Sequence, residues 1–482
     1  MNDFPKITRF ADAAALRARL AELDLELPVD DEILTAEAGS PLAEPHRFGN
    51  LPLGNRWCVH PMEGWDANAD GTPSELTLRR WRHFGESGAK LIWGGEAATV
   101  VAEGRANPHQ CVATAANRDG FARLLETVCD AHLEKFGATD DLVVGLQLTH
   151  SGRFSRPHGP QLEPKIAYHH PVLDAKFGID PADDGPLLGD DDIERLIDAY
   201  VAAAGLAREV GFQFVDVKAC HGYLMHEFLS ARTRAGRFGG DLEGRSRFLT
   251  TTIERIRAEY ADLQVAVRLS AFDLIPYEER NGQGVPIDYE PLLPYRYGFG
   301  IDADQPLAID MRETVALIRR LEELGVVAIN VSAGSPYYVP HIQRPALYPP
   351  CDGYPPPEDP LIGVARQILA TRRLKAALPE TFLVGSGYSY LQEFLPHVAQ
   401  GVIREGWADA VGLGRMVLSY PGMPVDTLTL GKTVRKKLCR TFSDCTTAPR
   451  NGMISGCFPL DDFYRERPEA ERLKEIKQAA RG

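Results

Sequence analysis

The 482-residue sequence is 44% hydrophobic and 25% charged, an ordinary globular composition in a chain long enough to bury a large core. Its formal net charge of −14 argues against a general affinity for nucleic acid or anionic membranes, and we interpret it as a contribution to solubility. No run of about 20 apolar residues predicts a membrane span. The charged N-terminus has no secretory apolar core, so the cytoplasm is the expected compartment.

The first 45 residues predict a helical segment, because ALRARLAELDLEL has apolar residues at helical spacing before PLAEP breaks the pattern. From residue 46 to 425, short apolar runs alternate with amphipathic stretches such as SELTLRRWRHFGESG. The eight apolar runs are WCVHP (57–61), AKLIWGG (89–95), DLVVGLQL (141–148), FQFVDVK (212–218), LQVAVRLS (263–270), VVAINVSA (326–333), TFLVGSG (381–387) and ADAVGLG (408–414).

Eight strands that alternate with helices predict parallel βα units with right-handed crossovers. Eight is also the number that closes a barrel, so the expected fold is a (β/α)8 TIM barrel. An open doubly wound sheet is the competing arrangement. It is disfavoured because no strand is followed by a G-x-G-x-x-G turn with a distant acidic residue.

Two unusually long segments follow the fifth and sixth predicted strands, at 271–310 and 334–360. Both leave the carboxyl ends of strands, where the active sites of barrels lie. Their many aromatic residues favour ordered lids over a substrate, and Phe272 and Tyr337 are candidate substrate contacts. The Pro-rich YPPCDGYPPPEDP is compatible with a simple spacer as well.

The most informative segment is FVDVKACHGYLMHEFLSARTRAGRFGGDLEGRSRF at 214–248. It resembles the Old Yellow Enzyme family of NADH:flavin oxidoreductases, in which the fourth strand ends in H-x-x-H or H-x-x-N before G-Y-L. The family's next block, R-x-D-x-[FY]-G-G-S-x-E-N-R-x-R-F, is similar to RTRAGRFGGDLEGRSRF. Further similar blocks follow in the family's order, covering roughly residues 45 to 425. They are RFGNLPLGNRWCVHPME, GGEAATV, LQLTHSGR, VRLSAFD, LVGSG and VGLGR.

The resemblance implies noncovalent FMN as the cofactor and NAD(P)H as the electron donor. The chemistry of the residues agrees, since the flavin pyrimidine needs an amide that donates and accepts, and reduced flavin favours a nearby permanent cation. Phosphate favours backbone amides of glycine turns after the last two strands. The candidate FMN-binding residues are Pro61, Met62, Ala97, Gln147, Arg268, Gly385, Gly387, Gly414 and Arg415.

The resemblance also assigns catalytic roles. His221 is the candidate hydrogen-bond donor to a substrate carbonyl, which makes the β-carbon a hydride acceptor. Tyr223 is the candidate donor of a proton to the α-carbon.

Two positions depart from the family pattern. Lys218 stands where the first histidine of the pair is expected, and Glu63 stands where cysteine or threonine follows Pro-Met, with Trp65 two residues on. We predict that Glu63 and Lys218 face each other on the substrate side of the flavin, with Trp65 as a further substrate contact. The pair would select a charged substrate, supply a base for oxidative chemistry, or form a buried ion pair.

The C-terminal extension, residues 426–482, contains a cysteine cluster. Larger relatives, 2,4-dienoyl-CoA reductase and trimethylamine dehydrogenase, hold a 4Fe–4S cluster with C-x2-C-x2–3-C-x11–12-C. Here Phe442 replaces the second ligand between Cys439, Cys445 and Cys457, so no metal is expected. A cysteinyl flavin is not expected either, since Glu63 takes that position. These relatives continue into nucleotide-binding domains, so here electrons are expected to reach FMN directly or from a separate protein.

The leading hypothesis is an ene-reductase that passes hydride from NAD(P)H through FMN to an activated alkene, such as an α,β-unsaturated carbonyl compound. An FMN dehydrogenase that oxidises its substrate, with Glu63 or Tyr223 as the base, is the second. A flavin-free lyase that forms a Schiff base on Lys218 is the third, and an inactive binding protein the fourth. A small molecule is the expected partner, and family precedent suggests a homodimer or a larger homo-oligomer.

Overall fold

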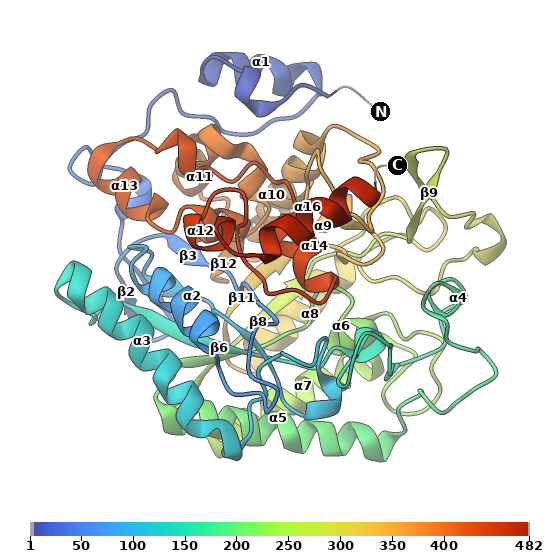
Figure 1. The fold of residues 1–482 in the computed structure, drawn as a ribbon. Coiled ribbons are helices and arrows are strands. Elements are labelled where there is room, and N and C mark those ends of the chain that lie inside the picture. The colour runs from blue at the N-terminus through green and yellow to red at the C-terminus, as the bar shows by residue number, and fades with distance from the viewer. Residues whose placement is uncertain (1–3, 481–482) are drawn as a thin grey trace.

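The computed structural model describes residues 4–480 and is built around one closed parallel sheet (Figure 1). The strand order is β4-β3-β13-β12-β11-β8-β7-β6-β5, and a further pairing of β4 with β6 closes the ring. This is the predicted (β/α)8 barrel. The strands are β3 (Trp57–Val59), β4 (Leu91–Ile92), β5 (Ala97–Thr99), β6 (Val143–Thr149), β7 (Phe214–Val217), β8 (Gln264–Ser270), β11 (Val326–Ser332), β12 (Leu383–Gly385) and β13 (Ala410–Leu413).

The second position of the barrel holds two short strands in place of the single predicted one. β4 pairs with β3 and β6, and β5 then pairs with the later part of β6. Between them Gly94 and Gly95 have φ of +106° and +43°, which glycine adopts without a steric cost. The break turns the chain so that Glu96 and Ala97 follow at the carboxyl end of the barrel.

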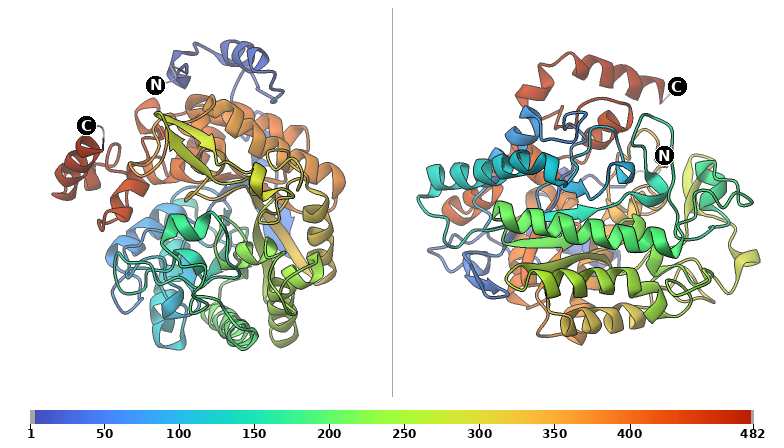
Figure 2. Two further views of the ribbon diagram at one scale, coloured as in Figure 1. Left: turned by 90° about the vertical axis from the view of Figure 1, so that its right-hand side faces the viewer. Right: turned by 90° about the horizontal axis from the view of Figure 1, so that it is seen from below.

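Helices follow the strands as the amphipathic stretches predict, and they form the outer ring (Figure 2). In α2 the buried face includes Leu78, Trp81 and Phe84, and a capping box of Ser74 and Thr77 starts the helix. The outer helices are α2 (Glu75–Gly85), α3 (Arg118–Phe136), α5 (Asp190–Val210), α6 (Leu224–Leu229), α7 (Leu242–Glu259), α8 (Arg312–Glu323), α10 (Pro360–Ala377), α11 (Leu395–Arg404), α12 (Arg415–Ser419) and α13 (Met423–Leu430).

A hairpin of β1 (His46–Phe48) and β2 (Leu51–Leu53) covers the amino end of the barrel. The buried ring of Phe48 lies 4.7 Å from that of Phe214, 5.8 Å from Trp93 and 5.6 Å from Phe382, measured between centroids. These aromatic contacts fill the barrel from below. The carboxyl ends of the strands therefore form the end at which a ligand enters.

The two long segments over that end are ordered. The first carries a hairpin of β9 (Tyr277–Arg280) and β10 (Gln283–Pro286), and the second carries the short helix α9 (Pro340–Gln343). The terminal segments also pack on the barrel. In the N-terminal one, α1 (Ala13–Glu22) is tied by Arg19 to Asp359 at 2.8 Å, and it ends sooner than its sequence pattern predicts.

The C-terminal segment contains α14 (Asp444–Arg450), α15 (Asp462–Arg465) and α16 (Glu469–Ala479). Arg79 of α2 fixes it through two hydrogen bonds to Asp461, at 2.9 and 3.1 Å. Within residues 4–480, none of the helices has the length and apolar character needed to cross a membrane.

Candidate active site

A cleft of about 1070 Å³ opens at the carboxyl ends of the strands. Side chains from all eight barrel positions reach it, and so do residues of the C-terminal segment. Most of the site residues predicted from the sequence meet here. Those that line the cleft are Pro61, Met62, Glu63, Ala97, Gln147, Lys218, His221, Tyr223, Arg268, Gly387, Gly414 and Arg415.

Glu63 lies in a tight turn after β3. Its Oε1 accepts a hydrogen bond from Trp65 Nε1 at 2.6 Å, and Trp65 has a φ of +47°, which is rare outside glycine. The turn is held from below by Arg80, which pairs with Asp66 at 2.6 Å and with Glu96 at 2.7 Å. Burial raises the pKa of Glu63 to about 7, although the charge of Lys218 acts in the opposite direction.

Lys218 follows β7 directly and is buried. Its Nζ lies 3.8 Å from the ring centroid of Tyr223, a cation–π contact. Lys218 and Glu63 line the same cleft and influence each other electrostatically, but within the described chain they form no ion pair. The two groups are therefore placed to act on a ligand.

Asp216, in the middle of β7, orients two of the cleft residues from below. Its carboxylate accepts hydrogen bonds from Gln147 Nε2 at 2.6 Å, from Trp93 Nε1 at 2.7 Å and from the backbone N–H of Arg268 at 2.6 Å. Burial raises the pKa of Asp216 to about 6, and these donors limit the rise. The contact with Gln147 fixes the amide so that its oxygen and second N–H remain for a ligand.

Arg268, near the end of β8, is a buried guanidinium without a counter-ion. Among the described residues it has no ion pair, and its Nε has no hydrogen-bond partner. A buried cation costs free energy unless an anion or hydrogen-bond acceptor compensates it. The position of Arg268 beside Gln147 in the cleft indicates a ligand that carries or develops negative charge.

His221 has a φ of +66° and is held by a hydrogen bond from its backbone N–H to Ser270 Oγ at 3.0 Å. Its Nε2 lies 2.7 Å from Ser332 Oγ and 3.3 Å from Gln343 Nε2. Burial first, and then the charge of Arg268, hold the pKa of His221 well below its usual value, so the ring is neutral. With Nε2 accepting from Gln343, Nδ1 carries the proton and can donate to a ligand.

A second group of cations lies at the other end of the cleft. Burial, and after it the neighbouring charge of Arg415, lower the pKa of Arg344 to about 10. Arg415 Nη2 donates to the backbone oxygen of Pro345 at 2.9 Å, while its buried Nη1 has no partner within residues 4–480. Two adjacent guanidiniums without an acidic partner fit a phosphate, which accepts from both.

Glycine turns complete this end. Gly387 has a φ of +96°, and a Cβ on Gly414 would meet only Met62 Sδ at 3.6 Å, so Gly414 leaves its backbone open to the cleft. A flat flavin with a phosphate tail fits this cleft, with Gln147 and Arg268 at one end and the arginine pair with the glycine turns at the other.

Four predicted residues do not line the cleft. Gly385 is buried at the end of β12, and Phe272 is fully buried in the core beyond β8. Trp65 and Tyr337 reach the site indirectly, through hydrogen bonds to Glu63 and to Tyr223. Phe272 is thus separated from any ligand in the cleft, because the alternation of side chains after β8 turns it into the core.

Several residues that line the cleft or lie beneath it were not predicted from the sequence. The buried imidazole of His60 contacts Asn330 Nδ2 and Ser386 Oγ at 3.0 Å each, which fixes it beneath the cleft. Asp216 could have been predicted, because an acidic side chain inside an otherwise apolar strand is buried and needs hydrogen-bond partners. Nothing in the sequence could have identified Arg344, because only the folded loop brings it close to Arg415.

The C-terminal segment contributes Cys445, Thr446 and Ser455 to the cleft lining. Cys439 and Cys457 lie close enough to Cys445 for their charged forms to interact, and all three are free thiols. In the part of the chain that the structure describes, no group of three His, Cys, Asp or Glu side chains is arranged to hold a metal ion. Phe442 instead packs against Tyr348, with centroids 5.6 Å apart.

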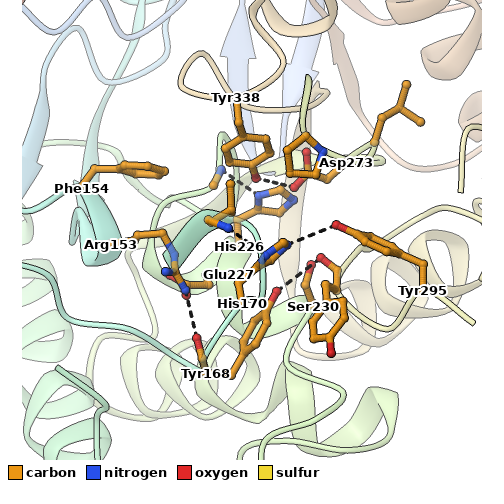
Figure 3. Close-up of a pocket in the computed structure, with 15 residues that line it drawn as sticks. Arg153, Phe154, Tyr168, His170, His226, Glu227, Ser230, Asp273, Tyr295 and Tyr338 are labelled. Carbon is orange, nitrogen blue, oxygen red and sulfur yellow. Dashed lines mark hydrogen bonds and ion pairs between the residues drawn. The ribbon is translucent and has the colours of Figure 1, made fainter. Parts of the chain in front are cut away.

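A second, smaller cavity of about 380 Å³ lies behind the turn at Gly222 (Figure 3). Arg153 crosses it and pairs with Asp174 and, at 2.7 Å, with Glu227. Figure 3 shows Asp273 on the far side, where it accepts a hydrogen bond from Tyr338 Oη at 2.5 Å. We call this space the polar chamber.

The fold and the cleft together define a flavin-binding (β/α)8 barrel, and comparisons with known proteins agree. The family model for the NADH:flavin oxidoreductase / NADH oxidase family matches residues 41–281. The chain belongs to this family, which is the Old Yellow Enzyme family predicted from the sequence. It is an NAD(P)H:flavin oxidoreductase with FMN as its cofactor.

Two curated relatives show the range of the family. An NADPH dehydrogenase of Geobacillus thermodenitrificans (strain NG80-2) is 27% identical over 395 residues, covering 80% of this chain and 92% of the relative. An NADH oxidase of Thermoanaerobacter brockii is 27% identical over 388 residues, covering 78% of this chain but 49% of that longer protein.

Solved structures share the fold. A 2-naphthoyl-CoA reductase in complex with 2-naphthoyl-CoA superposes with a TM-score of 0.65 and 17% identity, covering 88% of this chain and 57% of that one. Morphinone reductase in complex with tetrahydroNAD gives a TM-score of 0.55 and 19% identity, covering 82% of this chain and 92% of that one. The old yellow enzyme homologue from Zymomonas mobilis gives 0.55 and 22% identity, covering 82% and 96%.

Proposed function

We propose that this enzyme is an ene-reductase, which uses NAD(P)H to reduce an activated alkene such as an α,β-unsaturated carbonyl compound. The observation that carries the proposal is the grouping of Lys218, His221 and Tyr223 on one wall of the cleft, beside the candidate FMN residues Gln147 and Arg268. Bound FMN supplies the hydride chemistry between NAD(P)H and the substrate.

The three wall residues have distinct roles in this proposal. His221 Nδ1 donates a hydrogen bond to the substrate carbonyl, and Lys218 Nζ adds a positive charge next to it. Both stabilise the negative charge that develops on the oxygen as the β-carbon accepts hydride. The hydroxyl of Tyr223 delivers a proton to the α-carbon.

We further propose that the substrate is flat and bulky. Tyr223 presents an aromatic ring to the cleft, and Tyr337 and Phe154, which stack with centroids 3.9 Å apart and planes 16° apart, support this ring from outside the cleft. Such a wall suits an unsaturated ring system. The neighbour with the TM-score of 0.65 was solved with 2-naphthoyl-CoA, an aromatic thioester.

A second candidate is an FMN dehydrogenase that oxidises its substrate, with Glu63 as the base. The observation that favours it is the pKa of Glu63, which burial raises to about 7. A carboxyl group with that pKa is matched to removing a proton near neutral pH. Since the family binds FMN, the flavin-free lyase is left without support.

The test is an anaerobic absorbance titration of the purified holoenzyme with NADH and NADPH, followed by addition of a cyclic enone. An ene-reductase bleaches with the nicotinamide and recovers its flavin colour with the enone. In the Tyr223→Phe variant the recovery should slow by about 100-fold or more, while bleaching is unchanged.

If the wild-type flavin is bleached but no enone restores its colour, the ene-reductase proposal fails. If the nicotinamides leave the flavin oxidised and reduction by a substrate depends on Glu63, the dehydrogenase is favoured instead. The Glu63→Gln variant identifies the dehydrogenase. With Glu63 as the base, the rate of flavin reduction by the substrate should rise with pH near 7 in the wild type, and this rise should be absent from the variant.

A further inference from the structure

The hydroxyl of Tyr223 has one hydrogen-bond partner within residues 4–480, the hydroxyl of Tyr337 at 3.0 Å. The two rings meet edge to face, with centroids 6.0 Å apart and planes at 81°. Tyr223 is only 6% exposed, whereas Tyr337 is half-buried. The two hydroxyls therefore lie one after the other between the buried cleft and the solvent.

Tyr337 is held on both faces. One face stacks on Phe154, and Arg450 Cζ lies 5.1 Å from the ring centroid. Arg450 is itself fixed, since its Nη1 donates to both oxygens of Asp352 at 2.9 and 2.8 Å and its Nη2 donates to the backbone oxygen of Pro336 at 3.1 Å. It is the last residue of α14, so the C-terminal segment supplies it.

Each tyrosine thus has a cation against its ring, Lys218 on Tyr223 and Arg450 on Tyr337. A nearby cation favours the phenolate that forms when a tyrosine loses its proton. Burial raises the pKa of both hydroxyls, and the charge of Arg450 opposes the rise for both.

Other groups also act on the pair. The hydrogen bond between the tyrosines raises the pKa of Tyr223 and lowers that of Tyr337, and Arg156 lowers that of Tyr337 as well. Glu63 raises the pKa of both hydroxyls. The hydroxyl of Tyr337 lies 3.0 Å from that of Tyr223 on the more exposed side, which places it to pass a proton on to Tyr223.

We propose that Tyr337 restores the proton that Tyr223 gives to the substrate, and that Arg450 is the positioning residue for this transfer. The inference rests on the proposed ene-reductase function. The β-carbon receives the hydride that NAD(P)H supplies, and the O–H bond of Tyr223 breaks as a C–H bond forms at the α-carbon. The proton of Tyr337 then moves to the Tyr223 oxygen, and water reprotonates Tyr337.

The test compares Tyr337→Phe with Tyr348→Phe by anaerobic stopped-flow in H2O and D2O. Phenylalanine at 337 keeps the stacking ring and removes only the hydroxyl. Tyr348 lies on the same loop, and its hydroxyl makes no hydrogen bond to a described residue, so its variant is the matched control. We expect the Tyr337 variant to reoxidise with an enone about 10-fold more slowly, with a larger solvent isotope effect and an unchanged rate of reduction by NAD(P)H.

Arg450 is tested by Arg450→Met and by Arg450→Lys, which retains the charge. Methionine should slow reoxidation as Tyr337→Phe does, and lysine should restore part of the rate. If Tyr337→Phe reoxidises at the wild-type rate with the wild-type isotope effect, as Tyr348→Phe does, the relay is overturned.

A second readout does not depend on turnover. Carbon-13 NMR of tyrosine labelled at Cζ, with assignments from Tyr223→Phe and Tyr337→Phe, reports on the surroundings of each hydroxyl in the holoenzyme at neutral pH. Arg450→Met should shift the Tyr337 resonance, and Tyr337→Phe should shift the Tyr223 resonance. If neither resonance responds, the pair is overturned even in an active ene-reductase. If both respond but the wild type reduces no alkene, the failure lies in the proposed function.

Discussion

The cleft and the polar chamber meet at one turn of the chain, yet they treat charge in opposite ways. His221 and Tyr223 line the cleft, and Gly222 between them lines the chamber. In the chamber, Arg153 is neutralised by Asp174 and Glu227. In the cleft, Lys218, Arg268 and the arginine pair have no acidic partner within 4.0 Å among residues 4–480.

The difference teaches how a binding site is distinguished from a structural cavity. Charges that are paired inside the protein stabilise only the fold around them. Charges left without a partner in a water-accessible cleft destabilise the empty protein and are compensated when a ligand of opposite charge binds. Among the described residues, a few buried polar atoms of the chamber have no hydrogen-bond partner, such as His226 Nε2 and Asp273 Oδ1. An ordered water molecule can satisfy such atoms.

The largest expected effect lies in the chamber. Arg153→Met removes the partner of two buried carboxylates and should lower the free energy of unfolding by about 3 to 5 kcal/mol. Urea denaturation measures it. Arg208→Met is the matched control, because its pair with Asp262 is exposed to solvent and its loss should change stability far less. Equal effects of the two substitutions would remove the contrast on which the comparison depends.

The pH dependence of stability sharpens the comparison further. Burial raises the pKa of Asp273 from 3.8 to about 7, despite the hydrogen bond from Tyr338. Between these values the folded state binds more protons than the unfolded state, so stability falls as pH rises through the window and levels off above it. The fall is on the order of 4 kcal/mol at most. Asp273→Asn should remove this fall in stability, which urea midpoints measured between these pH values follow. If the variant shows the same fall as the wild type, the pKa of Asp273 is not raised by folding.

A smaller effect is expected for the cleft, and it concerns the cofactor more than the fold. Arg268→Met removes a buried cation without a counter-ion, so the apoprotein should unfold at the same or a higher urea concentration. FMN should bind about 10 to 100 times more weakly, or be harder to reduce, because a charged hydrogen-bond donor is lost. Fluorescence titration of FMN and potentiometry measure these quantities. An unchanged affinity and potential would mean that Arg268 does not contact the flavin.

The sequence was enough to predict the barrel and most of the cleft. The βα alternation requires a parallel sheet with its connections on one side, and this places Gln147, Lys218 and Arg268 at the same end whatever the details of packing. The motif around His221 and Tyr223 is continuous in the chain, so local sequence defines it.

Tertiary structure alone decided the contacts between distant segments. Tyr223 meets Tyr337, Tyr337 meets Arg450, and Arg344 meets Arg415 only after loops of different length close over the barrel. No periodicity encodes such pairs, because the course of a loop depends on its packing against the finished core. The sequence by itself therefore determined the scaffold and the chemistry that this enzyme offers, while folding decided which charges are neutralised and which remain for a ligand.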